Sequence, residues 1–395
     1  MNEPSSLWRR WLEILLVSTK LGLTSFGGPV AHLGYFRDEY VKKRNWLDDR
    51  SYADLVALCQ FLPGPASSQV GISIGMVRGG IVGGVLSWVG FTMPSVIALI
   101  IFAYVLQGFD AADSGWIHGL KIVAVAVVAQ ALIGMGKNLT PDWTRITMAV
   151  IAAFITLFYP SVLGQILTII IAGMIGYVLY KKVEMKPAED MNITIRKSTG
   201  IIAWVLFFGL LAGLPILRQA APSLWISMID TFYRVGSIVF GGGHVVLPMI
   251  EREVVPPGWV TDAEFLAGYG ATQAVPGPLF TFAGYLGTVM AGWQGAIIAT
   301  IAMFFPSFLL VLGTLPFWNG LRRRPAFQAA LMGINAAVVG ILLAALYDPV
   351  WTSAVKGPAD FALALGAFTL LVYWKAAPWL VVAAAAVGGY AISLL

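Results

Sequence analysis

Charged residues and cysteine are scarce in this chain of 395 residues. Asp, Glu, Lys and Arg make up 11% of it, against about 25% in a typical soluble domain, which argues against a water-soluble enzyme. The single cysteine, Cys59, excludes an intramolecular disulfide and a thiolate metal site. The net charge of +5 is too small to indicate binding to nucleic acid, so we expect no nucleic-acid partner.

The motifs of soluble enzymes are also missing. The sequence contains no H-E-x-x-H, P-loop or dinucleotide fingerprint. The segment from Gly71 to Gly75 matches the G-x-S-x-G hydrolase pattern, but Gly71, Gly75 and Gly79 recur every four residues, which favours packing of helices through small residues. We therefore expect no catalytic residue, no cofactor and no metal site.

Apolar residues are abundant, at 58% of the chain, together with 43 Gly and 21 Pro. This composition predicts an all-α polytopic membrane protein with short loops and broken helices. The N-terminus lacks the basic region and cleavage pattern of a signal peptide, so the first apolar run is expected to remain as a span. About 13 spans are predicted, at roughly 12–33, 52–76, 80–107, 116–136, 144–159, 162–180, 200–217, 225–248, 264–287, 290–316, 327–347, 358–374 and 377–394.

The chain is an internal duplication. Phe26-Gly27-Gly28 recurs as Phe240-Gly241-Gly242, and Pro63-Gly64-Pro65 recurs as Pro276-Gly277-Pro278. Six more identities follow in order, as one-residue gaps reduce the offset between the copies from 214 to 213 and then 212: Glu39 with Glu253, Trp46 with Trp259, Asp49 with Asp262, Gln60 with Gln273, Pro94 with Pro306, and Ser95 with Ser307. The predicted units are a first repeat at 1–181, a charged connector with a linker helix at 182–222, and a second repeat at 223–395.

The linker helix makes the two repeats opposite in orientation, because equivalent helices then lie an odd number of crossings apart. Inverted repeats are typical of secondary transporters, which bind substrate near the bilayer midplane. With the N-terminus inside, 15 Lys and Arg fall on the cytoplasmic side and 8 outside, which predicts a cytoplasmic N-terminus and an external C-terminus. The basic segment from Arg37 to Arg50 is the exception, because this count places it outside.

Lys20 and Arg234 occupy equivalent positions, each six residues before its Phe-Gly-Gly motif and inside an apolar run. A basic residue at mid-span costs about 2.5–3.5 kcal/mol, so a matched pair indicates a shared interior rather than two side chains reaching the interface. Their charge suits an anionic substrate.

The glycine and proline motifs interrupt their helices. Gly27-Gly28-Pro29 supplies two permissive residues and a helix-starting proline, and the second copy is Gly241-Gly242-Gly243-His244. Neither Pro-Gly-Pro segment can continue a helix. In the first copy Ser67 and Ser68 follow as candidate caps, in the second Thr281 follows, and Gln60 and Gln273 precede the breaks. Free N–H groups at such breaks bind anions; the alternatives are close glycine packing and a structural kink.

Two kinds of titratable residue remain. Glu39 and Glu253 are the only repeat-matched glutamates; they are either proton-coupling groups or interfacial residues that pair with neighbours such as Arg37 and Arg252. The three histidines are not at equivalent positions. A lone histidine is more often structural than a ligand, and only His244 lies inside a candidate motif.

In its paired motifs the sequence resembles the chromate ion transporter family in its long, two-domain form. The resemblance is carried by Phe26-Gly27-Gly28-Pro29, by Phe240-Gly241-Gly242-Gly243-His244 and by both Pro-Gly-Pro segments. It covers essentially the whole chain. The second copy departs at Gly243 and at Leu279-Phe280, which predicts that the two half-sites contribute unequally.

The resemblance implies export of chromate across the cytoplasmic membrane and chromate resistance, with sulfate as a structural look-alike. We expect an oxyanion and the lipid bilayer as partners, and alternating access of the two repeats as the mechanism. A homodimer is compatible with the sequence. The competing hypotheses are uptake or exchange of sulfate or another oxyanion, and a channel or membrane sensor.

Overall fold

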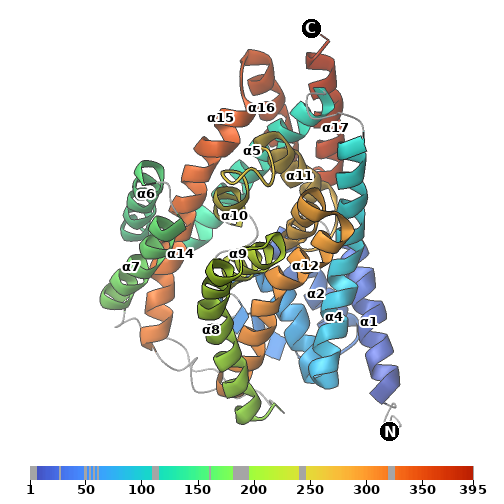
Figure 1. Cartoon of the computed structure of the whole chain (residues 1–395), viewed down its shortest axis with the longest axis vertical. Coiled ribbons are helices and arrows are strands. Elements are labelled where there is room, and N and C mark those ends of the chain that lie inside the picture. The colour runs from blue at the N-terminus through green and yellow to red at the C-terminus, as the bar shows by residue number, and fades with distance from the viewer. Residues whose placement is uncertain are drawn as a thin grey trace.

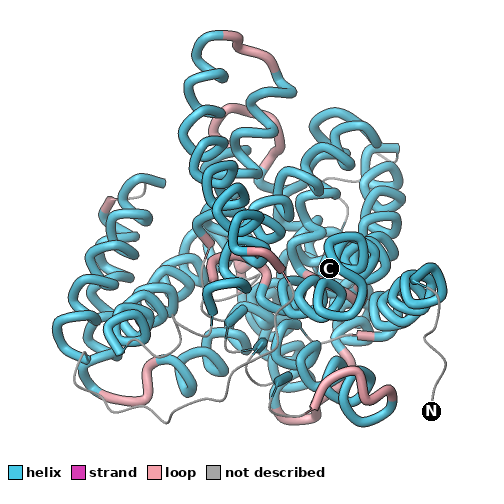
Figure 2. The backbone as a smooth tube through the Cα atoms, turned by 90° about the horizontal axis from the view of Figure 1, so that it is seen from below, coloured by secondary structure: helices cyan, strands magenta, loops and turns pink. Residues whose placement is uncertain are grey.

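The computed structural model describes residues 7–25, 28–48, 51–52, 55–56, 58–59, 62–108, 115–159, 162–180, 195–239, 246–318 and 325–394. Regular structure in these ranges is helical, with short connections (Figures 1 and 2). The two ends of the chain lie at opposite ends of the long axis (Figure 1). The molecule is therefore all-α, as the composition predicts.

Fewer helices are long enough to cross a membrane than the 13 runs suggest. Five described segments are long and apolar enough: 66–107, 118–137, 197–220, 279–317 and 328–348. Four further apolar helices are shorter. Part of the difference arises because several predicted spans reverse direction within their length.

The first reversal follows α1 (Leu7–Thr24). The next helices, α2 (Gly28–Phe36) and the π-helix η1 (Arg37–Lys43), return along α1. Lys20 Nζ lies 2.9 Å from Glu39 Oε2, and Arg44 Nη1 lies 2.9 Å from Glu13 Oε1. In one straight helix these pairs would be about 28 and 46 Å apart. The run at 12–33 is thus part of a helical hairpin rather than a straight span.

The second reversal occurs at each Pro-Gly-Pro segment. Before the first segment, Cys59 Sγ lies 3.6 Å from Ser73 Oγ, which comes after it. In the second repeat α11 (Asp262–Ala274) precedes the segment, and the Tyr285 hydroxyl donates across it to the Glu264 carbonyl at 2.8 Å. A straight helix would separate Glu264 from Tyr285 by about 31 Å. The predicted runs 52–76 and 264–287 therefore fold back on themselves, because the proline break ends the helix and the glycine lets the chain turn.

A third reversal lies inside each long helix. In α4 (Ala66–Gly108) Gly79 and Gly80 have φ/ψ of −133/16° and 67/−163°, and in α12 (Phe282–Thr314) Ala291 and Gly292 have −154/30° and 62/−161°. The matching angles at equivalent positions support the duplication. After the turn, Gly75 packs on the Gly83 backbone and Gly287 packs on the Gly295 backbone, so small residues let the two arms of each hairpin touch, as the spacing of Gly71, Gly75 and Gly79 predicts.

The long arms of the two repeats cross each other in opposite directions. Trp88 packs against Phe304 at a tilt and edge-on against Phe308, each with 5.7 Å between ring centroids, and the Trp293 amide donates to the Tyr104 hydroxyl at 3.0 Å. Residue numbers therefore rise along one arm as they fall along the other. The helices α4 and α12 contact each other in this antiparallel crossing.

The remaining helices are exchanged between repeats. In the first repeat, α5 (Gly115–Leu139) packs against α16 (Pro358–Val372) and α17 (Pro378–Ile392) of the second. In the second repeat, α14 (Pro325–Ala345) packs against α6 (Trp143–Phe158) and α7 (Val162–Tyr180) of the first. The linker helix α8 (Lys197–Ala220) lies on α9 (Leu224–Ile238) and α12, and α9 is followed by α10 (Val246–Val254).

Candidate functional site

The hairpin tips of the two repeats meet. The Gly64 amide donates to the Val239 carbonyl at 2.6 Å, and the Gly277 amide donates to the Ser25 carbonyl at 2.9 Å. Val239 and Ser25 are the residues just before the two Phe-Gly-Gly motifs. Each Pro-Gly-Pro tip is thus hydrogen-bonded to the Phe-Gly-Gly approach of the other repeat, which brings the two motif classes to one place.

This place lies halfway along the long arms. The Ser95 hydroxyl donates to the Pro276 carbonyl, and Ser95 is the fifteenth residue after Gly80, about 22 Å along an arm that continues to residue 108. The equivalent Ser307 accepts from Gln69 Nε2 at 3.5 Å. Backbone that is not helical at this depth is tolerated beside protein or a water-filled cavity.

The glycines of both tips have backbone angles that other residues avoid. Gly64 has φ of +111° and Gly277 has φ of +101°, in the left-handed region that costs a residue with a Cβ atom about 1–3 kcal/mol. A Cβ on Gly64 would also lie 2.7 Å from Ser307 Oγ. The turn and the close approach of the two repeats both require glycine.

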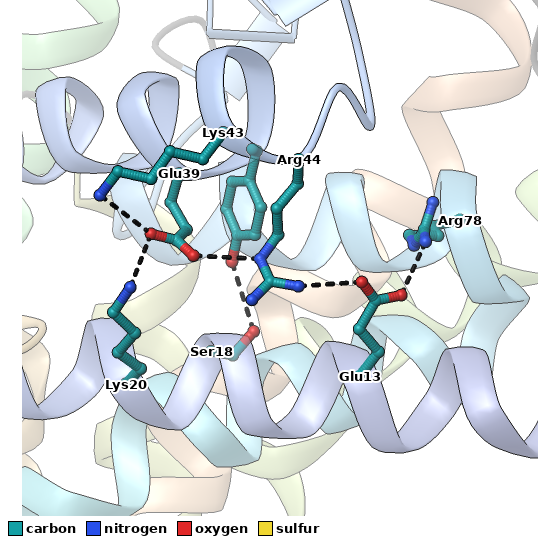
Figure 3. Close-up of polar contacts among 8 residues, drawn as sticks. Glu13, Ser18, Lys20, Glu39, Lys43, Arg44 and Arg78 are labelled. Carbon is teal, nitrogen blue, oxygen red and sulfur yellow. Dashed lines mark hydrogen bonds and ion pairs between the residues drawn. The ribbon is translucent and has the colours of Figure 1, made fainter.

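Lys20 lies in a network of ions on the α1 hairpin (Figure 3). Glu39 is 5% exposed, and its carboxylate contacts Lys20 at 2.9 Å, Arg44 at 3.0 Å and Lys43 at 3.5 Å. The lysine itself is 54% exposed. Glu39 thus contacts Lys20, rather than only loop residues as one interpretation of the sequence expects, and Lys43 and Arg44 neutralise it as well.

The same network continues to the start of α1. The Glu13 carboxylate pairs with the Arg44 guanidinium at 2.9 Å and with the Arg78 guanidinium at 2.7 Å. The Arg78 guanidinium also lies over the Trp46 ring, 4.2 Å from its centroid. Residues 44–46 therefore lie beside the first turns of α1. The count of Lys and Arg predicts instead that this segment and the N-terminus lie on opposite sides of the membrane. Four basic residues against two carboxylates give this network a formal charge of +2: Lys20, Lys43, Arg44 and Arg78 against Glu13 and Glu39.

Arg234 has an equivalent position but a more closed environment. It contacts Glu253 at 2.5 Å and Asp230 at 3.0 Å and is 19% exposed. Arg218 adds contacts to Asp230 at 3.1 Å and to Glu253 at 3.9 Å. Two arginines against two carboxylates make this second network neutral.

The other predicted site residues have several outcomes. Phe26, Gly27, Gln60 and the segment 240–244, which holds Phe240, Gly241, Gly242, Gly243 and His244, lie outside the described residues. The helix restarts at Gly28, one residue before Pro29. The Pro278 carbonyl accepts the Thr281 hydroxyl at 2.7 Å, and Gln273 Nε2 is buried without a hydrogen-bond partner in the described part of the chain.

Ser67 and Ser68 do not make the predicted caps in the described hydrogen bonds. The Ser67 hydroxyl pairs with His32 Nδ1 at 3.2 Å, while Ser68 Oγ is buried and has no partner among the described residues. The first helical bond of α4 runs from the Gln69 amide to the Pro65 carbonyl at 2.9 Å. The N–H groups that precede Gln69 thus face the tip region without a side-chain cap from these hydroxyls.

Ser25, His32 and Gln69 are fully or almost fully buried at the tips, and none of them is among the site residues predicted from the sequence. One signal could have found them: at the equivalent positions the second repeat has Val239, Val246 and Phe282. A duplication that replaces polar residues by apolar ones points to a role confined to one copy. Within the described ranges no three His, Cys, Asp or Glu side chains come together as metal ligands would.

Comparisons with known proteins identify the family of the chain. The sequence profile described as "Chromate transporter" matches residues 12–177 and 226–390, one region in each repeat. The chain belongs to the chromate transporter family. It is therefore a member of a transporter family and a multi-pass membrane protein.

Relatives within the chromate transporter family align over most of the chain. A chromate transport protein of Cupriavidus metallidurans is 27% identical over 97% of this chain and 94% of its own length, and one of Pseudomonas aeruginosa is 24% identical over 90% and 86%. An uncharacterized transporter of Methanocaldococcus jannaschii is 28% identical over 87% and 84%. No solved structure matches the chain.

Proposed function

We propose that this protein exports chromate, a tetrahedral dianion, across the cytoplasmic membrane and thereby confers chromate resistance. The observation that carries the proposal is that each Pro-Gly-Pro tip, halfway along one of two antiparallel arms, is hydrogen-bonded to the residue that precedes the Phe-Gly-Gly motif of the other repeat. Helix N-termini and N–H groups suit an oxyanion rather than a metal cation. The relatives named as chromate transport proteins give the substrate class.

In this proposal residues 1–181 and 223–395 are inverted repeats joined by 182–222, and they rock to expose the tips to either side in turn. The N-terminus is cytoplasmic and the C-terminus external. In this proposal the basic segment 37–44 counts as cytoplasmic, because Arg44 contacts Glu13 on α1, and Arg252 counts as external, because α10 returns along α9. The positive-inside bias still favours this orientation.

The charge difference between the two networks supports outward transport. The network with formal charge +2 then faces the cytoplasm, where it attracts a dianion, and the neutral network faces outside. A membrane potential that is negative inside drives a dianion outward and releases about 4.6 kcal/mol of free energy per 100 mV, from about 2.3 per charge. Attraction and membrane potential act in the same direction.

Lys20 and Arg234 can leave their carboxylates for the substrate without stranding a buried charge. When Lys20 turns to the anion, Arg44 and Lys43 still neutralise Glu39. When Arg234 does so, Arg218 still contacts Asp230 and Glu253. Glu39 and Glu253 then hold the cations in the unloaded state, and proton exchange at these glutamates is not required.

The test measures chromate accumulation in everted membrane vesicles with an imposed inside-positive potential and sulfate as competitor. We expect saturable uptake that sulfate inhibits and that Lys20→Ala and Arg234→Ala reduce at least tenfold at equal membrane content. Lys42→Ala is the matched control, because Lys42 is an exposed lysine of the same hairpin that, among the described residues, pairs only locally with Asp38.

Three results would contradict the proposal. Transport of sulfate without chromate flux would indicate an uptake or exchange transporter, and non-saturable flux would indicate a channel. Normal transport by both the Lys20 and the Arg234 variants would remove these residues from the mechanism.

A further inference from the structure

One buried polar cluster at the tips belongs to the first repeat alone. His32 on α2 bonds through Nδ1 to Ser67 Oγ at the start of α4, and the Ser25 backbone lies against its imidazole. The ring packs edge-on against Phe91 of the long arm, with 5.4 Å between centroids. Three elements of one repeat thus fix this histidine, and the Ser25 carbonyl also receives the Gly277 amide of the other repeat.

Several polar atoms of this cluster are left without a partner. Ser25 Oγ, His32 Nε2, Ser68 Oγ and Gln69 Oε1 are buried and make no hydrogen bond with the described residues. The four residues are only 0 to 2% exposed. Each such atom costs about 1–3 kcal/mol when nothing binds it, and buried polar atoms without partners concentrate where a ligand or water completes them.

The cluster surrounds the start of a helix. The first arm of α4 runs from Ala66 to the turn at Gly79, so its first amides and its partial positive charge lie at Ser67 and Ser68. Hydroxyl, imidazole and amide donors at a helix N-terminus form the kind of site that binds a tetrahedral oxyanion. Neutral donors bind a dianion reversibly, which a transporter requires.

The second repeat lacks most of this chemistry at the same positions. The counterpart of Ser68, Thr281, keeps a hydroxyl, but this hydroxyl donates to the Pro278 carbonyl. Ser25, His32, Ser67 and Gln69 correspond to Val239, Val246, Phe280 and Phe282, and these four apolar residues are buried in one core cluster. The two repeats therefore have the same backbone turns but unequal linings. We propose that the neutral side-chain donors to the oxyanion come from the first repeat alone, at Ser25, His32, Ser67 and Ser68, in addition to the cations Lys20 and Arg234, while the second repeat supplies the apolar wall and the backbone turn against which the site closes. This inference rests on the proposed function and names its binding site.

The test measures binding directly, with radiolabelled sulfate and chromate on the purified full chain in lipid nanodiscs. Ser68→Ala removes a hydroxyl that supports nothing else in the described structure, so the protein is expected to fold normally and to lose at least tenfold in affinity. His32→Gln is expected to lose as much. Phe280→Leu, at the counterpart of Ser67, is the control and should stay within about twofold of wild type.

The outcomes separate this inference from the proposed function. Wild-type affinity in Ser68→Ala and in His32→Gln, in a protein that still transports, would overturn the binding site and leave oxyanion transport standing. An equal loss in Phe280→Leu would overturn the restriction to the first repeat. Failure of the wild-type protein to bind or transport either anion would overturn both.

Discussion

At the scale of single residues, the two tip glycines join the repeats. Each is at positive φ, and each donates its amide across the repeat boundary. A side chain at Gly277 would collide with Ser95 Oγ, the hydroxyl that caps the Pro276 carbonyl. Strain in the turn and loss of a bond between the repeats would therefore occur together.

We expect Gly277→Ala to destabilise the protein by about 1–3 kcal/mol and to reduce chromate transport at least tenfold. The lowered Tm of the detergent-solubilised protein and vesicle transport check this. Gly209→Ala is the control, because Gly209 has no neighbour within 4 Å of its added Cβ and lies in α8, where alanine is the better helix former. A Gly277 variant with wild-type Tm and transport would contradict the role of the tip.

The candidate site could be predicted only in part from the sequence. The Pro-Gly-Pro breaks and the matched basic residues are visible as repeats, because each is an identity in register. Lys20 and Glu39 are 19 residues apart, so their contact exists only after α2 returns along α1. His32 looks like any lone histidine until its partner Ser67, 35 residues later, is brought beside it.

At the scale of elements, the helical hairpins depend on glycine faces. The Gly287 position packs on the Gly295 backbone, as Gly75 packs on Gly83. A proline or glycine break has the same sequence pattern whether the chain continues onward or reverses. The sequence therefore predicts where the helices end but not that they fold back, so the pattern at 52–76 and 264–287 predicts straight spans.

We expect Gly287→Leu to separate the two arms of its hairpin at a cost of about 1–3 kcal/mol or more, with loss of folded protein from the membrane. Size-exclusion profile and Tm after solubilisation measure this. Gly209→Leu, at an exposed position of α8, is the matched control and should leave both unchanged. Equal behaviour of the two variants would mean that the arms can separate freely.

At the scale of the whole molecule, the two repeats carry the same turns on opposite sides of the proposed membrane. Asn45 and Gly258 are equivalent and both have positive φ, 53° and 76°. Beside them, Lys42 and Pro256 are equivalent and exposed. Under the proposed orientation the first lies in the cytoplasm and the second outside.

Labelling of single cysteines tests this orientation. A membrane-impermeant maleimide should modify Pro256→Cys in spheroplasts and Lys42→Cys only in everted vesicles. Native Cys59 is fully buried, so the background is expected to be low. Modification of both positions from the same side would rule out inverted repeats.

The exchange of helices between the repeats has a consequence for how the protein is made. Gly119 on α5 packs on the Ala385 backbone of α17, and Gly333 on α14 packs on the Ala172 backbone of α7. When the ribosome has finished the first repeat, α5 still lacks the partners that close it, and these arrive with the last helices of the chain. The first half must therefore wait in the bilayer, loosely assembled, until translation ends. Quality control of this protein would then act on the complete chain, not on its halves.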